Sequence, residues 1–282
     1  MATKTFLRAA LILAVMAGPV WGQVEEVVEV DELDISNFPG ALVEDVVVPV
    51  PSEVFMVLDK LGDPDWGAEL YEGEYSGYTD RTQLALVFGT AVADGFVAVQ
   101  AKDRAGIQRL GREVLRLGEA IGIRDAVVGH CNSIIESAND EDWKSIRREL
   151  DRTQSTVRTT MERMRDEDLA QAVSIGGWLR GTEVITSLIT GAYSKDKAEL
   201  LSQPDLVAYF GRSIDDMDED VKGNEKMVAV GEGLEIIRKL MDNGDEVLDA
   251  DEVTEMQEVC ARLLGLVRES GSGGGEVGGG GA

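Results

Sequence analysis

Six consecutive residues in the second half of the chain, Gly176 to Gly181, combine side chains suited to a ligand site with an unusual number of glycines. The segment reads Gly-Gly-Trp-Leu-Arg-Gly. In a functional interpretation, Trp178 stacks on a ligand and Arg180 binds its anionic group. Three glycines inside a helix cost about 1 kcal/mol each relative to alanine, so something must compensate for them. The structural interpretation, which we favour, is that the glycines admit a neighbouring helix, Trp178 fills the core and Arg180 is paired.

Asp94 is the single charge in the apolar segment from Leu84 to Val99, which also carries small residues every four positions. An unpaired charge in such a segment is too costly to keep. We therefore expect the helices at 84–99 and 167–191 to pack together, with Asp94 and Arg180 joined or bridged by water. Paired and fully buried, the two residues are structural. Facing an open cavity, they form a ligand site together with Trp178.

Cys131 and Cys260 are the only cysteines. An even number of cysteines in an exported chain suggests a disulfide, but both lie on predicted helices far apart in sequence, so the spacing leaves the bond open. His130 beside Cys131 suggests a nucleophile with its base. Successive helical residues point about 100° apart, however, so these two side chains would not face each other. One histidine and two cysteines are also too few for a zinc site.

The acidic segment from Met241 to Glu252, between two predicted helices, resembles the calcium-binding loop of EF-hand proteins. The candidate metal ligands are Asn243, Asp245, Asp249 and Glu252. Two positions depart from the pattern: Met241 stands where the first carboxylate belongs, and Glu246 stands where the sharp turn requires glycine. We therefore expect an ordinary acidic loop between helices, and a calcium-responsive module is the weakest functional alternative.

Other chemical signatures are missing from the sequence. No Cys-x-x-Cys-His haem site is present, and a single histidine excludes the usual carboxylate and histidine di-iron bundle. A Gly-x-Gly-x-x-Gly match at Gly273, Gly275 and Gly278 lies in low-complexity sequence with no strand before it. We expect no cofactor.

The first 22 residues have the layout of a cleavable secretory signal. Lys4 and Arg8 precede the apolar run from Leu11 to Val20, and Val20-Trp21-Gly22 places suitable residues before a cut at Gln23. About ten apolar residues are short for a membrane span. We therefore expect cleavage after Gly22 and export of a soluble protein to the periplasm or the extracellular space.

The charge of the chain restricts its partners. Asp and Glu number 53 against 27 Lys and Arg, which gives a net charge of −26. Such a surface repels phosphates and anionic lipid headgroups, so we expect neither nucleic acid nor a membrane as partner. A protein or envelope partner, cationic in character, is favoured instead. Residues 23–50 contain eight acids and no Lys or Arg, which predicts an extended, disordered acidic tail, and the glycine-rich residues 270–282 predict a second disordered tail.

Helical periodicity dominates residues 51–269. Apolar residues recur at steps of three and four from Ile107 to Ile121, and the same spacing from Trp143 to Met164 includes Thr153 and Thr160, as expected at the edge of a bundle. Strand alternation is absent outside the valine-rich tail. With 44% hydrophobic residues the chain can bury a substantial core. We predict an all-α domain over 51–269, an irregular bundle of roughly eight helices.

Two functional hypotheses from different classes follow. The leading one is a non-enzymatic interaction or binding module. Its rival is a small-molecule receptor or enzyme with a site near Asp94, Trp178 and Arg180. A closed, filled bundle favours the first hypothesis, and a deep cavity lined by these three residues favours the second.

Overall fold

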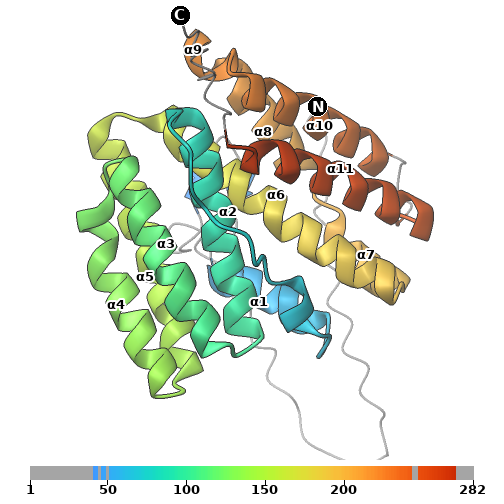
Figure 1. The fold of residues 1–282 in the computed structure, drawn as a ribbon. Coiled ribbons are helices and arrows are strands. Elements are labelled where there is room, and N and C mark those ends of the chain that lie inside the picture. Colours follow the sequence, from blue (N-terminus) through green and yellow to red (C-terminus); the bar gives the residue numbers. More distant parts are fainter. Residues whose placement is uncertain (1–40, 44–45, 49–50, 243–246, 271–282) are drawn as a thin grey trace, which may run out of the picture. The chain divides into compact units, whose positions relative to one another are not determined.

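In a computed structural model, the described part of the chain comprises residues 41–43, 46–48, 51–242 and 247–270. It is almost entirely helical (Figure 1), which confirms the all-α prediction. The predicted signal peptide and most of both predicted tails lie outside these residues.

Nine helices of ten residues or more make up the bundle within the described residues, against roughly eight predicted. They are α1 (Pro51–Lys60), α2 (Arg81–Gln100), α3 (Arg104–Ala120), α4 (Arg124–Asn139), α5 (Trp143–Met164), α6 (Glu167–Gly191), α8 (Pro204–Asp216), α10 (Glu225–Met241) and α11 (Ala250–Arg268). Shorter pieces are α7 (Lys195–Ala198), α9 (Glu219–Lys222) and the 3₁₀ turns η2 (Trp66–Glu69) and η3 (Glu199–Leu201).

A short antiparallel hairpin precedes the helices. Its strands are β1 (Ala41–Val43) and β2 (Val46–Val48), and Leu42 lies opposite Val47. These residues belong to the valine-rich end of the predicted extended tail, where β-branched side chains favour strand geometry.

Local sequence signals start and stop the helices. The Asp80 side chain accepts the Gln83 N–H at the start of α2, at 2.7 Å, and Asp103 caps α3 in the same way. Such caps satisfy backbone donors that have no partner within the helix. Gly122 has a φ of +84° directly after α3, a conformation that glycine adopts without strain.

The helices pack as a folded series in which α2 and α6 are the central pair (Figure 1). On one side of this pair α3, α4 and α5 follow in turn, and on the other side α11, α10 and α8 follow. By length and composition alone, α2 is the one described helix that could cross a membrane, but most of it is buried inside the bundle. Its apolar character on all sides is that of a core helix.

Glycines bring the backbones of α2 and α6 together. A Cβ added to Gly176 would lie 2.1 Å from the Leu86 carbonyl oxygen, and one added to Gly89 would lie 2.0 Å from the Val173 carbonyl oxygen. No side chain fits at either position. The predicted close approach of these helices is therefore confirmed. Gly181 takes no part in it, because a Cβ there would meet nothing within 4 Å.

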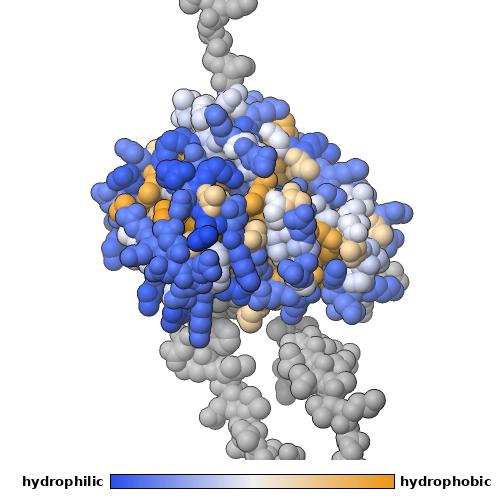
Figure 2. All heavy atoms as spheres, turned by 60° about the horizontal axis from the view of Figure 1, so that its bottom comes forward, coloured by the Kyte–Doolittle hydropathy of each residue, from blue (hydrophilic) through white to orange (hydrophobic). Residues whose placement is uncertain are grey.

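The surface in view in Figure 2 is mainly hydrophilic, and hydrophobic residues form small groups on it. The large hydrophobic side chains that are exposed among the described residues are spread over three helices: Met56 on α1, Met164 on α5, and Val228 and Ile236 on α10. Isolated residues of this kind are common on soluble proteins.

Candidate binding site

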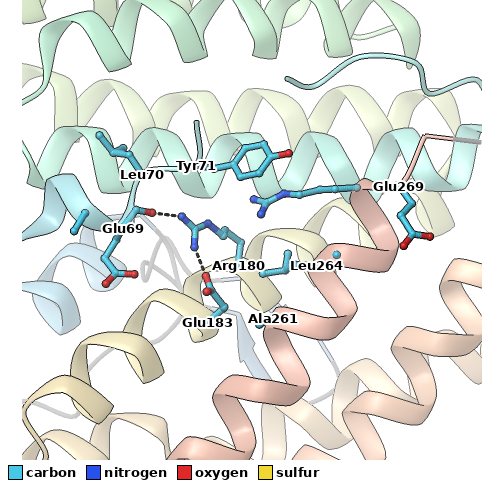
Figure 3. A pocket seen from close by; sticks show the side chains of 11 residues that line it. Glu69, Leu70, Tyr71, Arg180, Glu183, Ala261, Leu264 and Glu269 are labelled. Carbon is cyan, nitrogen blue, oxygen red and sulfur yellow. Dashed lines mark hydrogen bonds and ion pairs between the residues drawn. The ribbon is translucent and has the colours of Figure 1, made fainter. Parts of the chain in front are cut away.

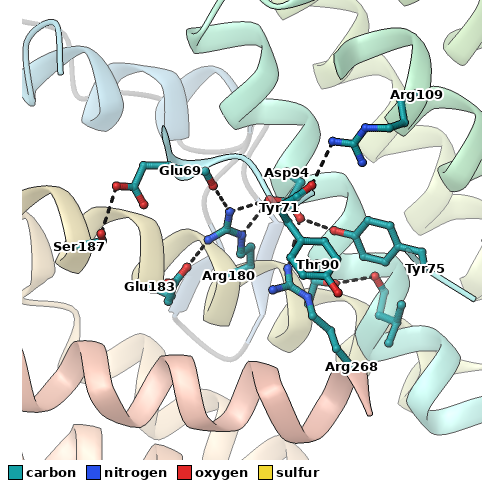
Figure 4. A network of polar contacts seen from close by, with 11 residues as sticks. Glu69, Tyr71, Tyr75, Thr90, Asp94, Arg109, Arg180, Glu183, Ser187 and Arg268 are labelled. Carbon is teal, nitrogen blue, oxygen red and sulfur yellow. Dashed lines mark hydrogen bonds and ion pairs between the residues drawn. The ribbon is translucent and has the colours of Figure 1, made fainter. Parts of the chain in front are cut away.

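Asp94 is the centre of a buried polar cluster and is fully inaccessible to solvent (Figure 4). Its Oδ1 accepts a hydrogen bond from Arg180 Nε at 2.8 Å. Its Oδ2 accepts hydrogen bonds from Arg268 Nη2 at 3.2 Å and from the Tyr75 hydroxyl. The expected joining of Asp94 and Arg180 across α2 and α6 is confirmed, and two further partners come from the loop before α2 and from the end of α11.

All three guanidinium nitrogens of Arg180 donate hydrogen bonds inside the protein, and the residue is only 4% exposed. Besides Asp94, it donates from Nη1 to Glu183 and from Nη2 to the carbonyl oxygen of Glu69. Burial acts to lower the pKa of Arg180, but the charges of Asp94 and Glu183 outweigh it and raise the pKa. Arg180 is therefore a permanently charged, internally satisfied residue.

Tyr75 completes the cluster as a neutral donor. The side chain is fully buried. Burial and the negative charge of Asp94 raise the pKa of its hydroxyl well above the ordinary value. The proton therefore stays on the oxygen and is shared with Asp94.

Arg268 is held from two sides and still has an unused donor. Its guanidinium carbon lies 3.8 Å from the centre of the Tyr71 ring, a cation–π contact, and Nη2 is bound to Asp94. Its Nε is buried and has no hydrogen-bond partner. The Tyr71 backbone is fixed in turn, because its carbonyl oxygen accepts a hydrogen bond from Arg109 at 3.0 Å.

The end of α11 that carries Arg268 is hydrogen-bonded to the first turn of α2 and to the loop before it. The Gln83 side-chain amide donates to the carbonyl oxygens of Val267 at 2.8 Å and Glu269 at 2.7 Å. The Tyr78 hydroxyl donates to the carbonyl oxygen of Arg268 at 3.2 Å. These bonds satisfy carbonyl groups that a helix end leaves without partners, and they fix the position of the arginine.

A pocket of about 530 Å³ opens to solvent beside this cluster (Figure 3). It lies between the η2 segment, α6 and the last turns of α11. Its charged lining residues are Glu69, Arg180, Glu183, Arg268 and Glu269, and the others are Ala68, Leu70, Tyr71, Ala261, Leu264 and Gly265. Asp94 stands behind the wall that the two arginines form.

Glu69 contributes a half-buried carboxylate to the pocket. Its Oε1 accepts a hydrogen bond from the Ser187 hydroxyl at 3.1 Å, and its other oxygen has no partner among the described residues. Burial raises the pKa of Glu69, and the Ser187 hydrogen bond opposes this only in part. A positively charged neighbour would therefore stabilise the ionised form of this carboxylate.

Trp178 lies apart from this pocket. Its Nε1 donates to Gln203 Oε1 at 3.3 Å, and its ring packs at a tilt against Phe210 on α8, with 5.7 Å between the ring centres. Two helical residues from Arg180, Trp178 points to a different side of α6. The structure therefore does not bring it together with Asp94 and Arg180, and the interpretation in which it packs in the bundle accounts for its position.

His130 is paired with Glu149 and Thr156 on α5 and not with Cys131. Its Nδ1 lies 2.7 Å from Glu149 Oε1 and its Nε2 lies 2.9 Å from Thr156 Oγ1. This order of hydroxyl, imidazole and carboxylate is that of a nucleophilic triad. However, Thr156 lies in the middle of α5, where backbone N–H groups are committed to the helix and cannot stabilise an oxyanion. We interpret the three residues as a brace between α4 and α5.

The cysteines are two free, buried thiols, on α4 and α11, so the disulfide considered from the sequence is not formed. Burial raises the pKa of Cys131 to about 11 and that of Cys260 to about 12. Both thiols are therefore protonated and unreactive at neutral pH.

Two of the four candidate calcium ligands in the EF-hand-like segment cap a helix in the structure. Asp249 and Glu252 form a capping box at the start of α11: the Asp249 carboxylate accepts the backbone N–H of Glu252, and the Glu252 carboxylate accepts the backbone N–H of Asp249. Asn243 and Asp245 lie outside the described residues. Within the described residues, no three His, Cys, Asp or Glu side chains are grouped to hold a metal ion.

The chemistry open to the pocket follows from the charged groups in its lining. Asp94 and Arg180 are hydrogen-bonded to each other, whereas the Arg268 guanidinium and the half-buried Glu69 carboxylate belong to the wall of the pocket. This arrangement is suited to holding a polar ligand. Comparisons of the chain with protein-family models, curated proteins and solved structures found no match.

Proposed function

We propose that the chain is an exported, non-enzymatic binding module whose recognition site is the pocket beside Tyr71 and Arg268. The observation that carries this proposal is the solvent-open pocket, whose lining contains the Arg268 guanidinium and the half-buried Glu69 carboxylate. A carboxylate and a guanidinium at the wall of one pocket can each bind a polar group of a ligand.

The buried cluster behind the pocket supports a binding role. Asp94 and the Tyr71 ring hold the Arg268 guanidinium in place before any ligand arrives. A recognition group that is already oriented loses little conformational entropy on binding. Asp94 acts here as a positioning residue, since its carboxylate is fully buried behind the arginines.

The binding proposal is tested by blocking the pocket without touching the polar cluster. Gly265 lines the pocket on the exposed side of α11, and a Cβ there would meet nothing within 4 Å, so Gly265→Phe fills space that is open. Gly129→Phe is a matched control, because Gly129 is also an exposed helical glycine with free space around it, on α4.

The readout is thermal stability in a panel of small carboxylates, amines and zwitterions at millimolar concentration. A ligand that binds only the folded state raises the melting temperature. We expect at least one compound to stabilise the wild type and Gly129→Phe but not Gly265→Phe, and to be recovered unchanged. A panel without effect on the wild type, or with equal effect on Gly265→Phe, would overturn the proposal.

Export is tested separately. The proposal rests on the amino-terminal sequence, and mature protein that begins at Gln23 outside the cytoplasm is the expected result. Amino-terminal sequencing that finds Met1 intact in the accumulated protein would contradict it.

A further inference from the structure

Two arginines reach Asp94 from different helices, and they are held unequally (Figure 4). Arg180, in the middle of α6, donates hydrogen bonds from all three guanidinium nitrogens. Arg268, in the last turn of α11, donates to Asp94 from Nη2, but its Nε is buried and has no partner among the described residues. A buried donor without an acceptor raises the free energy of the arrangement that holds it. The position of Arg268 therefore carries a cost that the position of Arg180 does not.

The two arginines also differ in what their withdrawal would leave behind. Without Arg268, Asp94 keeps two donors, the Arg180 guanidinium and the Tyr75 hydroxyl. The Arg268 Nε would gain water as a partner. Without Arg180, in contrast, both Asp94 and Glu183 lose a donor. A buried charge that loses its partner strongly destabilises a protein, so Arg268 can leave Asp94 at a lower cost than Arg180 can.

The surroundings of Arg268 give its side chain a way out. Arg268 lines the solvent-open pocket, whereas Asp94 does not. The Arg268 side chain is 12% exposed, against 5% for that of Arg180. It rests on the ring of Tyr71, in the segment 70–79, which forms neither helix nor strand. The side chain can therefore turn from Asp94 into the pocket without displacing a helix.

The backbone around Arg268 does not take part in this movement. The carbonyl oxygens of Val267 and Glu269 are bound by the Gln83 side chain, and the carbonyl oxygen of Arg268 is bound by the Tyr78 hydroxyl. None of these bonds involves the guanidinium group. Leaving Asp94 therefore needs a change of rotamer in one side chain and no unwinding of α11.

We infer that Arg268 is a latch, which leaves Asp94 and enters the pocket in the free protein, while Arg180 stays bound to Asp94. The latched form has the pocket empty and presents Arg268 and the Tyr71 ring as its wall. The unlatched form places the guanidinium group in the space that a ligand would fill. A ligand therefore binds the latched form and holds it closed. This regulation rests on the proposed binding function, whereas the movement of Arg268 does not.

Hydrogen exchange at the arginine Nε–H groups tests the movement. In protein labelled with ¹⁵N these groups are followed by NMR in D₂O, and Arg268→Lys and Arg180→Lys assign two of the signals by removing them. We expect Arg268 Nε–H to exchange at least about tenfold faster than that of Arg180, because it opens locally. It should exchange at least about tenfold more slowly than that of Arg262, an exposed arginine on the same helix.

Either of two results would overturn the latch. Equal rates for Arg268 and Arg180 would show that both groups open only when the whole fold opens. Equal rates for Arg268 and Arg262 would show that Arg268 is not closed at all in the free protein.

Filling the pocket tests where the side chain goes. Gly265 lies three residues before Arg268 on α11 and lines the same pocket, so the new side chain in Gly265→Phe would obstruct the way out. We expect this variant to slow exchange at Arg268 Nε–H at least about tenfold and to leave that of Arg180 unchanged. Gly129→Phe is the control and should change neither. An unchanged Arg268 rate in Gly265→Phe would contradict movement into the pocket.

The ligand panel separates this inference from the proposed function. Any panel compound whose stabilising effect is abolished by Gly265→Phe should also slow exchange at Arg268 Nε–H in the wild type. A compound that stabilises the protein in this way but leaves the exchange rate unchanged would refute the coupling of ligand to latch, while the pocket remains a binding site. If no compound stabilises the protein, the binding function fails, and the exchange rates of the free protein still decide whether Arg268 moves.

Discussion

Replacing Arg180 by methionine removes the best-buried cation of the described residues while keeping most of the side-chain volume. Asp94 would retain Arg268 and Tyr75 as partners, but it would lose the donor at 2.8 Å, and Glu183 and the Glu69 carbonyl oxygen would lose theirs. Breaking a buried ion pair from one side costs about 3–5 kcal/mol, because the remaining charge stays buried. We expect a loss of this size in the free energy of unfolding.

Urea titration followed by circular dichroism measures that loss, and thermal melting provides a second readout. For a domain of this size each kcal/mol lowers the Tm by about 2–4 °C, so the expected decrease is roughly 6–20 °C. Arg238→Met is the matched control, since Arg238 also pairs with a glutamate three residues away, but in an exposed position. It should change stability little.

A double-mutant cycle shows whether the loss belongs to the pair. With Asp94→Asn as the second change, the two substitutions should cost less together than the sum of their separate costs, by about 0.5–3 kcal/mol. A loss below about 1 kcal/mol for Arg180→Met, or strictly additive costs in the cycle, would refute the view that this pair stabilises the α2–α6 contact.

Three further predictions test other parts of the fold. Gly176→Ala places a Cβ 2.1 Å from the Leu86 carbonyl oxygen and should destabilise the protein by at least about 1–3 kcal/mol in urea titration, whereas Gly181→Ala has free space and should stabilise it by up to about 1 kcal/mol; equal effects would contradict the packing. Cys131 and Cys260 should react with Ellman's reagent only after unfolding, and prompt labelling of the native protein would refute their burial. Burial acts to raise the pKa of Glu149, but hydrogen bonds from His130 and Arg152 lower it below the ordinary value of 4.5. Its stabilising contribution is therefore complete above about pH 4.5 and is lost as pH falls through the lowered pKa. Glu149→Gln should reduce the dependence of unfolding free energy on pH in this acidic range, and an unchanged profile would count against the brace.

The fold was largely accessible from the sequence because its signals are local. Aspartates before apolar segments mark helix starts, as at Asp80 and Asp103, and the glycine after α3 marks a stop. The pairing of α2 with α6 was also predictable, because both helices are mostly apolar and contain glycines, and each has charge near its centre, Asp94 in α2 and the pair Arg180 and Glu183 in α6. The valine-rich tail is the one segment where the sequence left strand alternation open, but the hairpin there was not predicted, because its three-residue strands are too short to give a clear pattern.

The candidate site was only half accessible. Asp94 and Arg180 follow from the cost of burying single charges. Arg268 and Tyr75 do not, because an arginine in the last turn of a helix is an ordinary partner of the helix dipole, and Tyr75 lies in a loop with no periodicity. Trp178 was grouped with Arg180 because they are neighbours in sequence, although neighbouring helical positions face different directions. The sequence offers one clue to these two missed residues, which is the cost of burying Asp94. That cost shows that Asp94 needs a partner but does not show how many partners it has.

The contact of α2 and α6 through Gly89 and Gly176 has a consequence for how the molecule opens. Backbones that touch without intervening side chains cannot separate gradually, so a water molecule reaches their amide groups only when the two helices part altogether. The amide hydrogens of this pair should therefore be the slowest in the chain to exchange with deuterium, at a rate set by global unfolding. Those of α1, which contacts the bundle mainly through α5, should exchange long before them.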